Sequence, residues 1–297
     1  MPSASVQGGG VGFTSITGSI AAGTGAFTDT NGNFAASNVG NNITIKGAGA
    51  GGADYQGTIT AFTSPTAVTV SPNAGTTVVA NAPYLWGPAG GVISSNWTTT
   101  IKVTLATGQS VGDGIACGCN DDAAHGTPSF SDTAGNTFTQ RGSTISNADY
   151  QELIFTAAIT HASGSGANTI TCTFSALEAG FSEMFWRHFS NVGAFSQVKN
   201  SSSTGASVTT GNFGSSVLAG SVIWCFPGVN SHVSAVGSGY TGSGLTGLGD
   251  EEEYQIVGTT GTFAGTFTQS AAGIFVVSAI TFAPPTNNNN SLFFNAD

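Results

Sequence analysis

Apolar and polar residues alternate with a period of two at many places along the chain, and this pattern predicts β-strands. In one segment, Ile170, Cys172 and Phe174 alternate with threonines. Successive side chains of a strand point to opposite faces of its sheet, so this segment would bury an apolar face and expose a hydroxyl-bearing one. Further strands are expected at residues 42–46, 57–62, 67–70, 84–87, 101–105, 153–160, 184–189, 221–226, 262–268 and 274–282.

Turn signals between these segments suggest how the chain is divided. Residues 1–12 are small and Gly-rich, and we expect them to form an N-terminal arm. Residues 13–87 carry several short strands and predict a small β-barrel-like domain, followed by a Gly- and Pro-containing linker at 87–91. Residues 88–285 predict a jelly-roll-like β-sandwich, and residues 286–297 a C-terminal arm. The expected fold class is therefore all-β.

Composition favours the same fold class. Gly supplies 44 of the 297 residues, about twice the average usage of roughly 7%. Charged residues make up 7% of the chain, far below the roughly 25% of an ordinary globular domain. Hydrophobic residues still reach 39%, with 20 Phe, which is enough for a buried core. Because disorder needs low hydrophobicity and high charge, the composition predicts folded strands and turns.

Charge and targeting signals restrict the possible partners. The formal net charge is −10, and five scattered cations cannot form a surface for nucleic acid or anionic lipid. The N-terminus lacks the basic and apolar regions of a secretion signal, and no apolar run is long enough to span a membrane. An extracellular type of composition without a secretion signal is typical of virion proteins, which lysis releases. The cations are Lys46, Lys102, Arg141, Arg187 and Lys199.

The four cysteines predict buried free thiols. Cys117 and Cys119 lie two residues apart, which a strand would hold about 6.5–7 Å from each other, at the limit for a disulfide. Cys172 and Cys225 lie in apolar strand patterns, and a bridge between them stays open. The cysteine and histidine spacing does not match a zinc site.

One stretch of the predicted N-terminal domain contains Phe34, then Val39-Gly40, then a Gly47-Ala48-Gly49 turn. In this order of residues it resembles the small β-domain of phage tail-spike and virion proteins. That family shows a phenylalanine, a Val-Gly pair, isoleucines before a Gly-Ala-Gly turn, and then a Thr-Ile strand. The resemblance implies that this part docks on a viral particle. The matching residues are Phe34, Val39-Gly40, Ile43, Ile45, Gly47-Ala48-Gly49, Thr58-Ile59-Thr60 and Val68-Thr69-Val70.

Through Gly112-Asp113 and the segment from Ser131 to Thr139, the larger part resembles β-sandwich domains of phage and bacterial surface proteins. The resemblance rests on Gly112-Asp113 before a strand and on the segment from Ser131 to Thr139, which contains an Asp-x-x-Gly-Asn turn. Such a turn is also a hairpin signal on physical grounds. The resemblance implies a structural or glycan-binding role and transfers no catalytic residue.

Two motifs with catalytic or cofactor associations are expected to be turns. Residues 108–112 match GxSxG around Ser110, but a further strand follows them where a nucleophile elbow needs a helix. Residues 47–52 and 237–242 match GxGxxG, and neither match opens a helix. We therefore expect no enzymatic activity and no cofactor.

The acidic residues offer more chemistry. Asp121-Asp122 beside His125, and the run from Asp250 to Glu253, suggest oxygen ligands for Ca²⁺, a solvated loop or a contact with a neighbouring subunit. The sequence does not decide between these uses. Glu178 and Glu183 offer a carboxylate pair for glycoside hydrolysis, with a core strand whose charged ends face solvent as the favoured alternative.

Aromatic residues near these acids are candidates for stacking on a sugar. Trp186 and Tyr240 are the possible glycan contacts. The histidines His161, His188 and His232 have no plausible partner nearby in the sequence, and we expect structural roles for them.

The sequence thus predicts a non-enzymatic structural protein of a phage virion surface, either a capsid decoration or a head or tail fibre component. Its partners would be its own copies, other virion proteins and a host surface glycan. The alternatives are a subunit of a secreted extracellular filament, a lectin-like adhesin and a polysaccharide depolymerase.

Overall fold

A computed structural model of the chain confirms that it is all-β, with 55% of its residues in strands. Its sheets are antiparallel and sandwich-like, and none closes into a barrel. The structure describes residues 3–13, 18–30, 34–53, 55–82, 84–87, 100–105, 107–122, 127–147, 150–174, 182–243 and 250–285.

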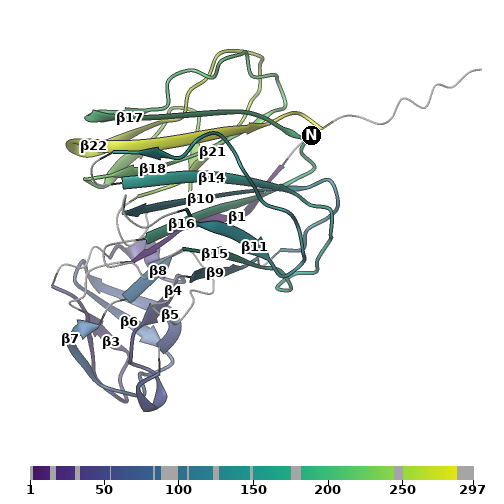
Figure 1. Cartoon of the computed structure of the whole chain (residues 1–297). Helices are drawn as coiled ribbons and strands as arrows, with labels where there is room; N and C mark the ends of the chain where they lie inside the picture. Colours follow the sequence, from purple (N-terminus) through teal and green to yellow (C-terminus); the bar gives the residue numbers. More distant parts are fainter. Residues whose placement is uncertain are drawn as a thin grey trace, which may run out of the picture.

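A small unit with its own core occupies the N-terminal part (Figure 1). Ile43 and Ile45 alternate along one strand and are both buried, as the period-two pattern predicts. The rings of Phe34 and Tyr84 stack, and Phe27 meets both edge-on. Its strands are β2 (Gly18–Ile20), β3 (Ala26–Thr28), β4 (Asn42–Ile45), β5 (Tyr55–Ser64), β6 (Ala67–Ser71), β7 (Val78–Ala82) and β8 (Tyr84–Gly87), with 3-10 turns η1 (Ala36–Asn38) and η2 (Ala50–Gly52).

This unit is open rather than the closed barrel that the strand count suggested. Its order is β8-β4-β5-β6-β3-β2-β7, and β7 and β8 do not pair with each other. The free side of β8 instead pairs with β1 (Ser3–Phe13). Short strands alone do not decide whether a sheet closes, because closure depends on tilt and register.

Strand β1 also corrects the expectation of an N-terminal arm. It pairs antiparallel with β16 (Ser182–Ser190), from Ser3 opposite Ser190 to Gly12 opposite Glu183. Strand pairing uses main-chain groups, so a Gly-rich segment with no apolar alternation can still add to an open edge. Through β1 the sheet of the small unit continues into the larger unit.

The larger unit contains three stacked sheets (Figure 1). The central one consists of β16, β10 (Gly114–Asp122) and β14 (Tyr150–Ala158), with β12 (Thr139–Gln140) and β13 (Ile145–Ser146) along β14. A three-stranded sheet on one side contains β9 (Thr100–Thr104), β11 (Ser129–Asp132) and β15 (Thr169–Thr173). On the other side lie β17 (Phe195–Thr209), β18 (Val222–Val229), β19 (Val233–Val236), β20 (Thr241–Gly242), β21 (Glu253–Ile256) and β22 (Thr266–Phe282).

Both faces of the central sheet are covered, which is one layer more than a two-sheet sandwich. Cys117 and Trp186 belong to the core shared with the three-stranded sheet. Phe185, the residue before Trp186 on β16, lies on the opposite face and packs with Trp224 and Ile280 of the six-stranded sheet. Strand β18 is buried along its whole length, because a further apolar cluster covers its second face. All four cysteines are buried and none is in a disulfide, as expected, so Cys172 and Cys225 are not bridged.

Two local expectations need correction. The turn from Asp132 to Asn136 does not close a hairpin, because β11 and β12 belong to different sheets. It carries the chain from the three-stranded sheet to the central one. The two strands expected at 262–268 and 274–282 form one long strand, β22.

Candidate functional site

The GxSxG segment forms the turn that leads into β10. The Ser110 backbone N–H donates to Asp113 Oδ2 at 2.8 Å, and the Asp113 N–H donates to the Ser110 carbonyl at 3.0 Å. Gly112 has a φ of +96°, which favours glycine. Strand β10 begins at Gly114, so the local context is the strand-forming one that the sequence indicated. The GxGxxG matches also lie in turns, with positive φ at Gly47 and Gly239.

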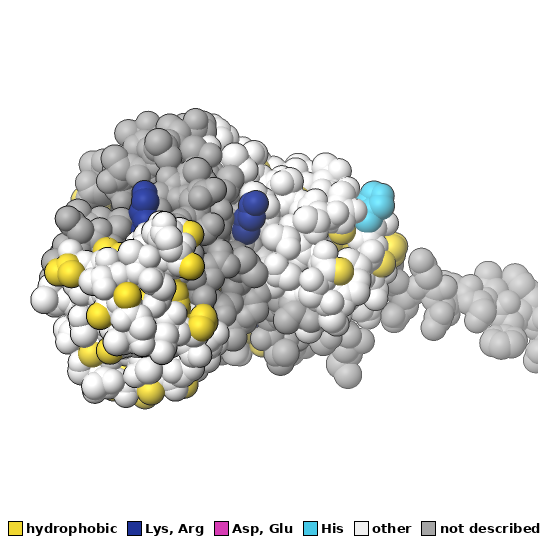
Figure 2. All heavy atoms as spheres, turned by 90° about the horizontal axis from the view of Figure 1, so that it is seen from below, with side chains coloured by type: hydrophobic (Ala, Val, Ile, Leu, Met, Phe, Trp, Pro, Cys, Tyr) yellow, Lys and Arg dark blue, Asp and Glu magenta, His cyan; other side chains and the backbone are white. Residues whose placement is uncertain are grey.

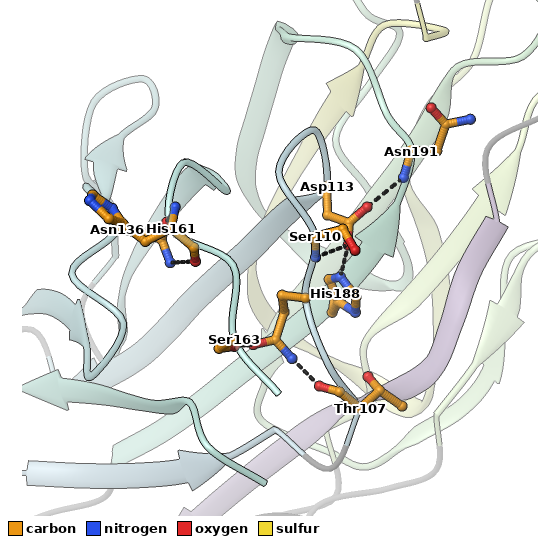
Figure 3. Close-up of polar contacts among 9 residues, drawn as sticks. Thr107, Ser110, Asp113, Asn136, His161, Ser163, His188 and Asn191 are labelled. Atoms are coloured by element: carbon orange, nitrogen blue, oxygen red, sulfur yellow. Dashed lines mark hydrogen bonds and ion pairs between the residues drawn. The ribbon is translucent and has the colours of Figure 1, made fainter. Parts of the chain in front are cut away.

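Asp113 and His188 form a buried pair that sequence reasoning missed (Figure 3). His188 Nε2 lies 2.9 Å from Asp113 Oδ2, and the Asn191 N–H donates to Asp113 Oδ1 at 2.8 Å. The two side chains are 75 residues apart in sequence. Ile115 pairs with His188 in the β10–β16 register, and only this register brings the two residues together. Asp113 therefore ties the start of β10 to the end of β16.

A second polar network fixes the turn after β11 (Figure 3). Asn136 Oδ1 accepts hydrogen bonds from the Thr160 and His161 backbone N–H groups, both at 2.9 Å. The Asn136 amide donates to Asp132 Oδ2 at 2.8 Å. The Asp-x-x-Gly-Asn motif thus connects two loops at the same end of the central sheet, and His161 takes part through its backbone.

Beside Asp113 lies a pocket of about 360 Å³. Its walls are of mixed character: Val192, Phe195 and Phe282 contribute apolar side chains, and Asp113, Arg141 and Thr156 contribute polar ones. Arg141 reaches it from the loop after β12: its Nε donates to Thr156 Oγ1 at 2.7 Å, and its Cζ lies 4.2 Å from the centre of the Phe195 ring. This is a solvent-connected hollow that combines an aromatic wall with a fixed cation.

Glu183, the candidate acid, does not face solvent. It lies between the central and six-stranded sheets with 0% exposure, and so does Glu152. Asn120 pairs in register with Glu152 on one side and with Glu183 on the other. Ser278 is also buried, on β22. The expected solvent-facing strand end is therefore wrong for Glu183, because a third sheet covers it. Glu178 and His125 lie outside the described residues, as does the side chain of Asp122.

Burial perturbs these carboxyls strongly. It raises the pKa of Glu152 well above its usual range; the Ser278 hydroxyl opposes this change, and the nearby Glu183 carboxyl adds to it. Burial likewise raises the pKa of Asp250, and Glu183 raises it further. Both causes favour the neutral form of Glu152 and of Asp250 over the charged form.

The acidic run that begins at Asp250 is not a solvated loop. Glu252 is buried and binds Arg187, whose Nε lies 3.0 Å from each carboxylate oxygen. The Arg187 guanidinium also stacks on Tyr254, at 4.3 Å from the ring centre. Burial raises the pKa of Glu253 to about 8, against hydrogen bonds from the Gly237 and Thr266 N–H groups. Within the described ranges, no three His, Cys, Asp or Glu side chains are arranged to hold a metal ion.

Of the two candidate glycan contacts, one is buried and the other is partly exposed. Trp186 is 1% exposed in the core between the central and three-stranded sheets, so its ring offers no face to a surface ligand. Tyr240 is half-buried, and its hydroxyl donates to the Ala264 carbonyl at 2.9 Å. Arg141 and Phe195 do line a pocket, but the local sequence does not identify them as site residues. Their contact joins two sheets and depends on the fold.

No family model matches this chain, and no curated protein or solved structure is significantly similar to it. Among the described residues there is no helix that is long and apolar enough to cross a membrane.

Proposed function

We propose that this chain is a structural subunit of a phage virion surface, which acts by assembling with its own copies and with other virion proteins. The observation that carries the proposal is the outer edge of β17. This strand has 15 residues and pairs with β22 along almost its whole length. Among the described strands, no other one pairs with β17.

The composition of this edge suits specific pairing with another polypeptide. An open edge presents main-chain donors and acceptors, and proteins usually protect it with charges, prolines or bulges. Lys199 and the irregularity after Gly205 flank the strand's centre. Between them, residues 201–204 are Ser-Ser-Ser-Thr and carry no charge. The flanking features would limit the register, while the hydroxyl-rich centre would pair with an added strand.

The surface is consistent with packing among many copies. On the face seen in Figure 2, the few Lys and Arg side chains lie apart from one another and hydrophobic groups are scattered, without a continuous charged patch. Assembly over such a surface would remove few charges from water, which keeps the desolvation free energy of assembly small. The choice of a virion, and not a secreted filament, rests on the resemblance of residues 34–70 to the small β-domain of phage tail-spike and virion proteins.

Assembly tests the proposal directly. The purified chain should form ordered oligomers in analytical ultracentrifugation and electron microscopy. The double variant Ser202→Lys/Thr204→Lys, which adds charge to the exposed centre of β17, should stay monomeric. Ser215→Lys/Ser238→Lys adds the same charge at other exposed positions and should assemble normally. A wild-type chain that is monomeric at every concentration would contradict the proposal.

Labelling distinguishes the kinds of particle. Antibodies raised against the chain should decorate phage particles in the electron microscope. Labelling of secreted filaments, with none on phage particles, would favour the filament alternative.

A further inference from the structure

Arg141 is one of only two arginines in the chain, and the two are used differently. Arg187 is buried and bound to the Glu252 carboxylate. Arg141 is half-buried at a pocket, and its only hydrogen bond from the side chain to a described residue is the one from Nε to Thr156. In that part of the chain no carboxylate is paired with it.

The guanidinium of Arg141 is held in a fixed orientation. The hydrogen bond of Nε to Thr156 Oγ1 fixes one edge, and the Phe195 ring supports one face. Thr156 is itself buried, so this anchor is rigid. Burial lowers the pKa of Arg141, which means that the cation has lost part of its hydration. A guanidinium fixed in this way can donate from its two Nη atoms to both oxygens of one anion.

The other polar groups of the pocket are already engaged. Asp113 accepts from the Ser110 and Asn191 N–H groups and contacts His188 Nε2. The Thr156 hydroxyl is taken by Arg141. The rest of the pocket's lining includes the apolar side chains of Phe282 and Val192. A volume of about 360 Å³ is at the small end of the range for ligand pockets, roughly 300–1,000 Å³.

We propose that this pocket binds a small carboxylate, with the Nη groups of Arg141 on the carboxylate oxygens and the ring or chain of the ligand against Phe195 and Phe282. The carboxylate is the shared chemistry of two sources: an acidic sugar of a surface glycan, or an aromatic or aliphatic acid. This site does not depend on the assembly role proposed above, and the β17 variants leave it intact.

Titration calorimetry on the full chain tests the site with two matched pairs of probes. These are sodium glucuronate against glucose, and sodium benzoate against benzyl alcohol. At least one carboxylate should bind saturably with one site per chain, and its neutral counterpart should not. Binding of glucuronate alone identifies the sugar source, and binding of benzoate alone identifies the apolar acid. Binding of neither overturns the proposal.

Two variants locate the site. Arg141→Gln should lower the affinity for the carboxylate about tenfold or more, since it removes a charge-assisted bidentate contact. Lys102→Gln removes one charge from an exposed position on β9 and should bind like the wild type. Ala158→Trp keeps Arg141 but fills the pocket from its exposed rim, and should also abolish binding. Unchanged affinity in both pocket variants would refute the assignment.

Discussion

The buried carboxyl of Glu253 makes a quantitative prediction about stability against pH. Its side chain is fully buried and its pKa is raised from 4.5 to about 8, with burial as the main cause and the Glu252 and Glu251 charges adding to it. Between these pH values the unfolded chain has released the proton while the folded chain retains it. Stability is therefore fully present below pH 4.5 and falls as pH rises to about 8.

The size of this loss follows from the same two values. Each pH unit in the window is equivalent to about 1.4 kcal/mol, so Glu253 alone accounts for about 5 kcal/mol between pH 4.5 and 8. Glu152 and Asp250, whose pKa values are also raised, act in the same direction. A total of this size is a large part of the stability of a typical domain, about 5–15 kcal/mol.

Urea unfolding at several pH values between 5 and 8 measures the effect. The free energy of unfolding should fall steadily across this range. Glu253→Gln cannot ionise at this position, so the pH slope of its unfolding free energy should be smaller than that of the wild type by about 1.4 kcal/mol per pH unit. Its stability at low pH should also be lower, because one oxygen must now accept from both the Gly237 and Thr266 N–H groups. Glu251→Gln removes only the smallest of the causes that raise the pKa of Glu253, and should keep most of the slope. A wild-type stability that is flat or rises with pH would refute the argument.

Two further predictions concern packing between the sheets. Gly118→Ala should destabilise the chain by about 1–3 kcal/mol, because a Cβ there would overlap the buried Phe226 ring. Thermal unfolding measures this loss, with Gly164→Ala as the control, since a Cβ at Gly164 would meet open space. A Gly118→Ala variant with an unchanged melting temperature would contradict the prediction. Arg187→Met should cost about 3–5 kcal/mol in urea unfolding, since it leaves the buried Glu252 without its cation. Glu252→Leu in the same chain should recover part of that loss, and a double variant no better than Arg187→Met would count against the explanation.

Local pattern was sufficient for the strands with strong apolar alternation and for several of their faces, but not for β1 or β17. Ile101 and Val103, and likewise Ile170 and Cys172, are buried as the alternation predicts, because the side-chain period of a strand is intrinsic to its backbone. The turns at Gly112 and Gly239 also follow from the sequence, since a positive φ favours glycine. Buried cysteines without disulfides were predictable for the same reason as the strands.

The candidate sites were much less predictable. Glu183 was expected at a solvent-facing strand end, and Trp186 on a sugar-binding surface, yet both are buried. Alternation shows that two faces of a strand differ, but it does not show what covers each face. A polar face can be covered by another sheet when its carboxyls take up protons or when a buried cation pairs with them, as Arg187 does with Glu252.

The sequence by itself therefore determined an all-β chain, the strands with strong apolar alternation and several turns. Only the tertiary structure decided that β1 joins the small and the larger unit, that three sheets stack in the larger one, and that Arg141 meets Phe195 at a pocket. The physical reason is the range of the interactions. Strand periodicity and turn geometry act between neighbours in the chain, whereas sheet pairing, burial and the pairing of charges depend on residues that only folding brings together.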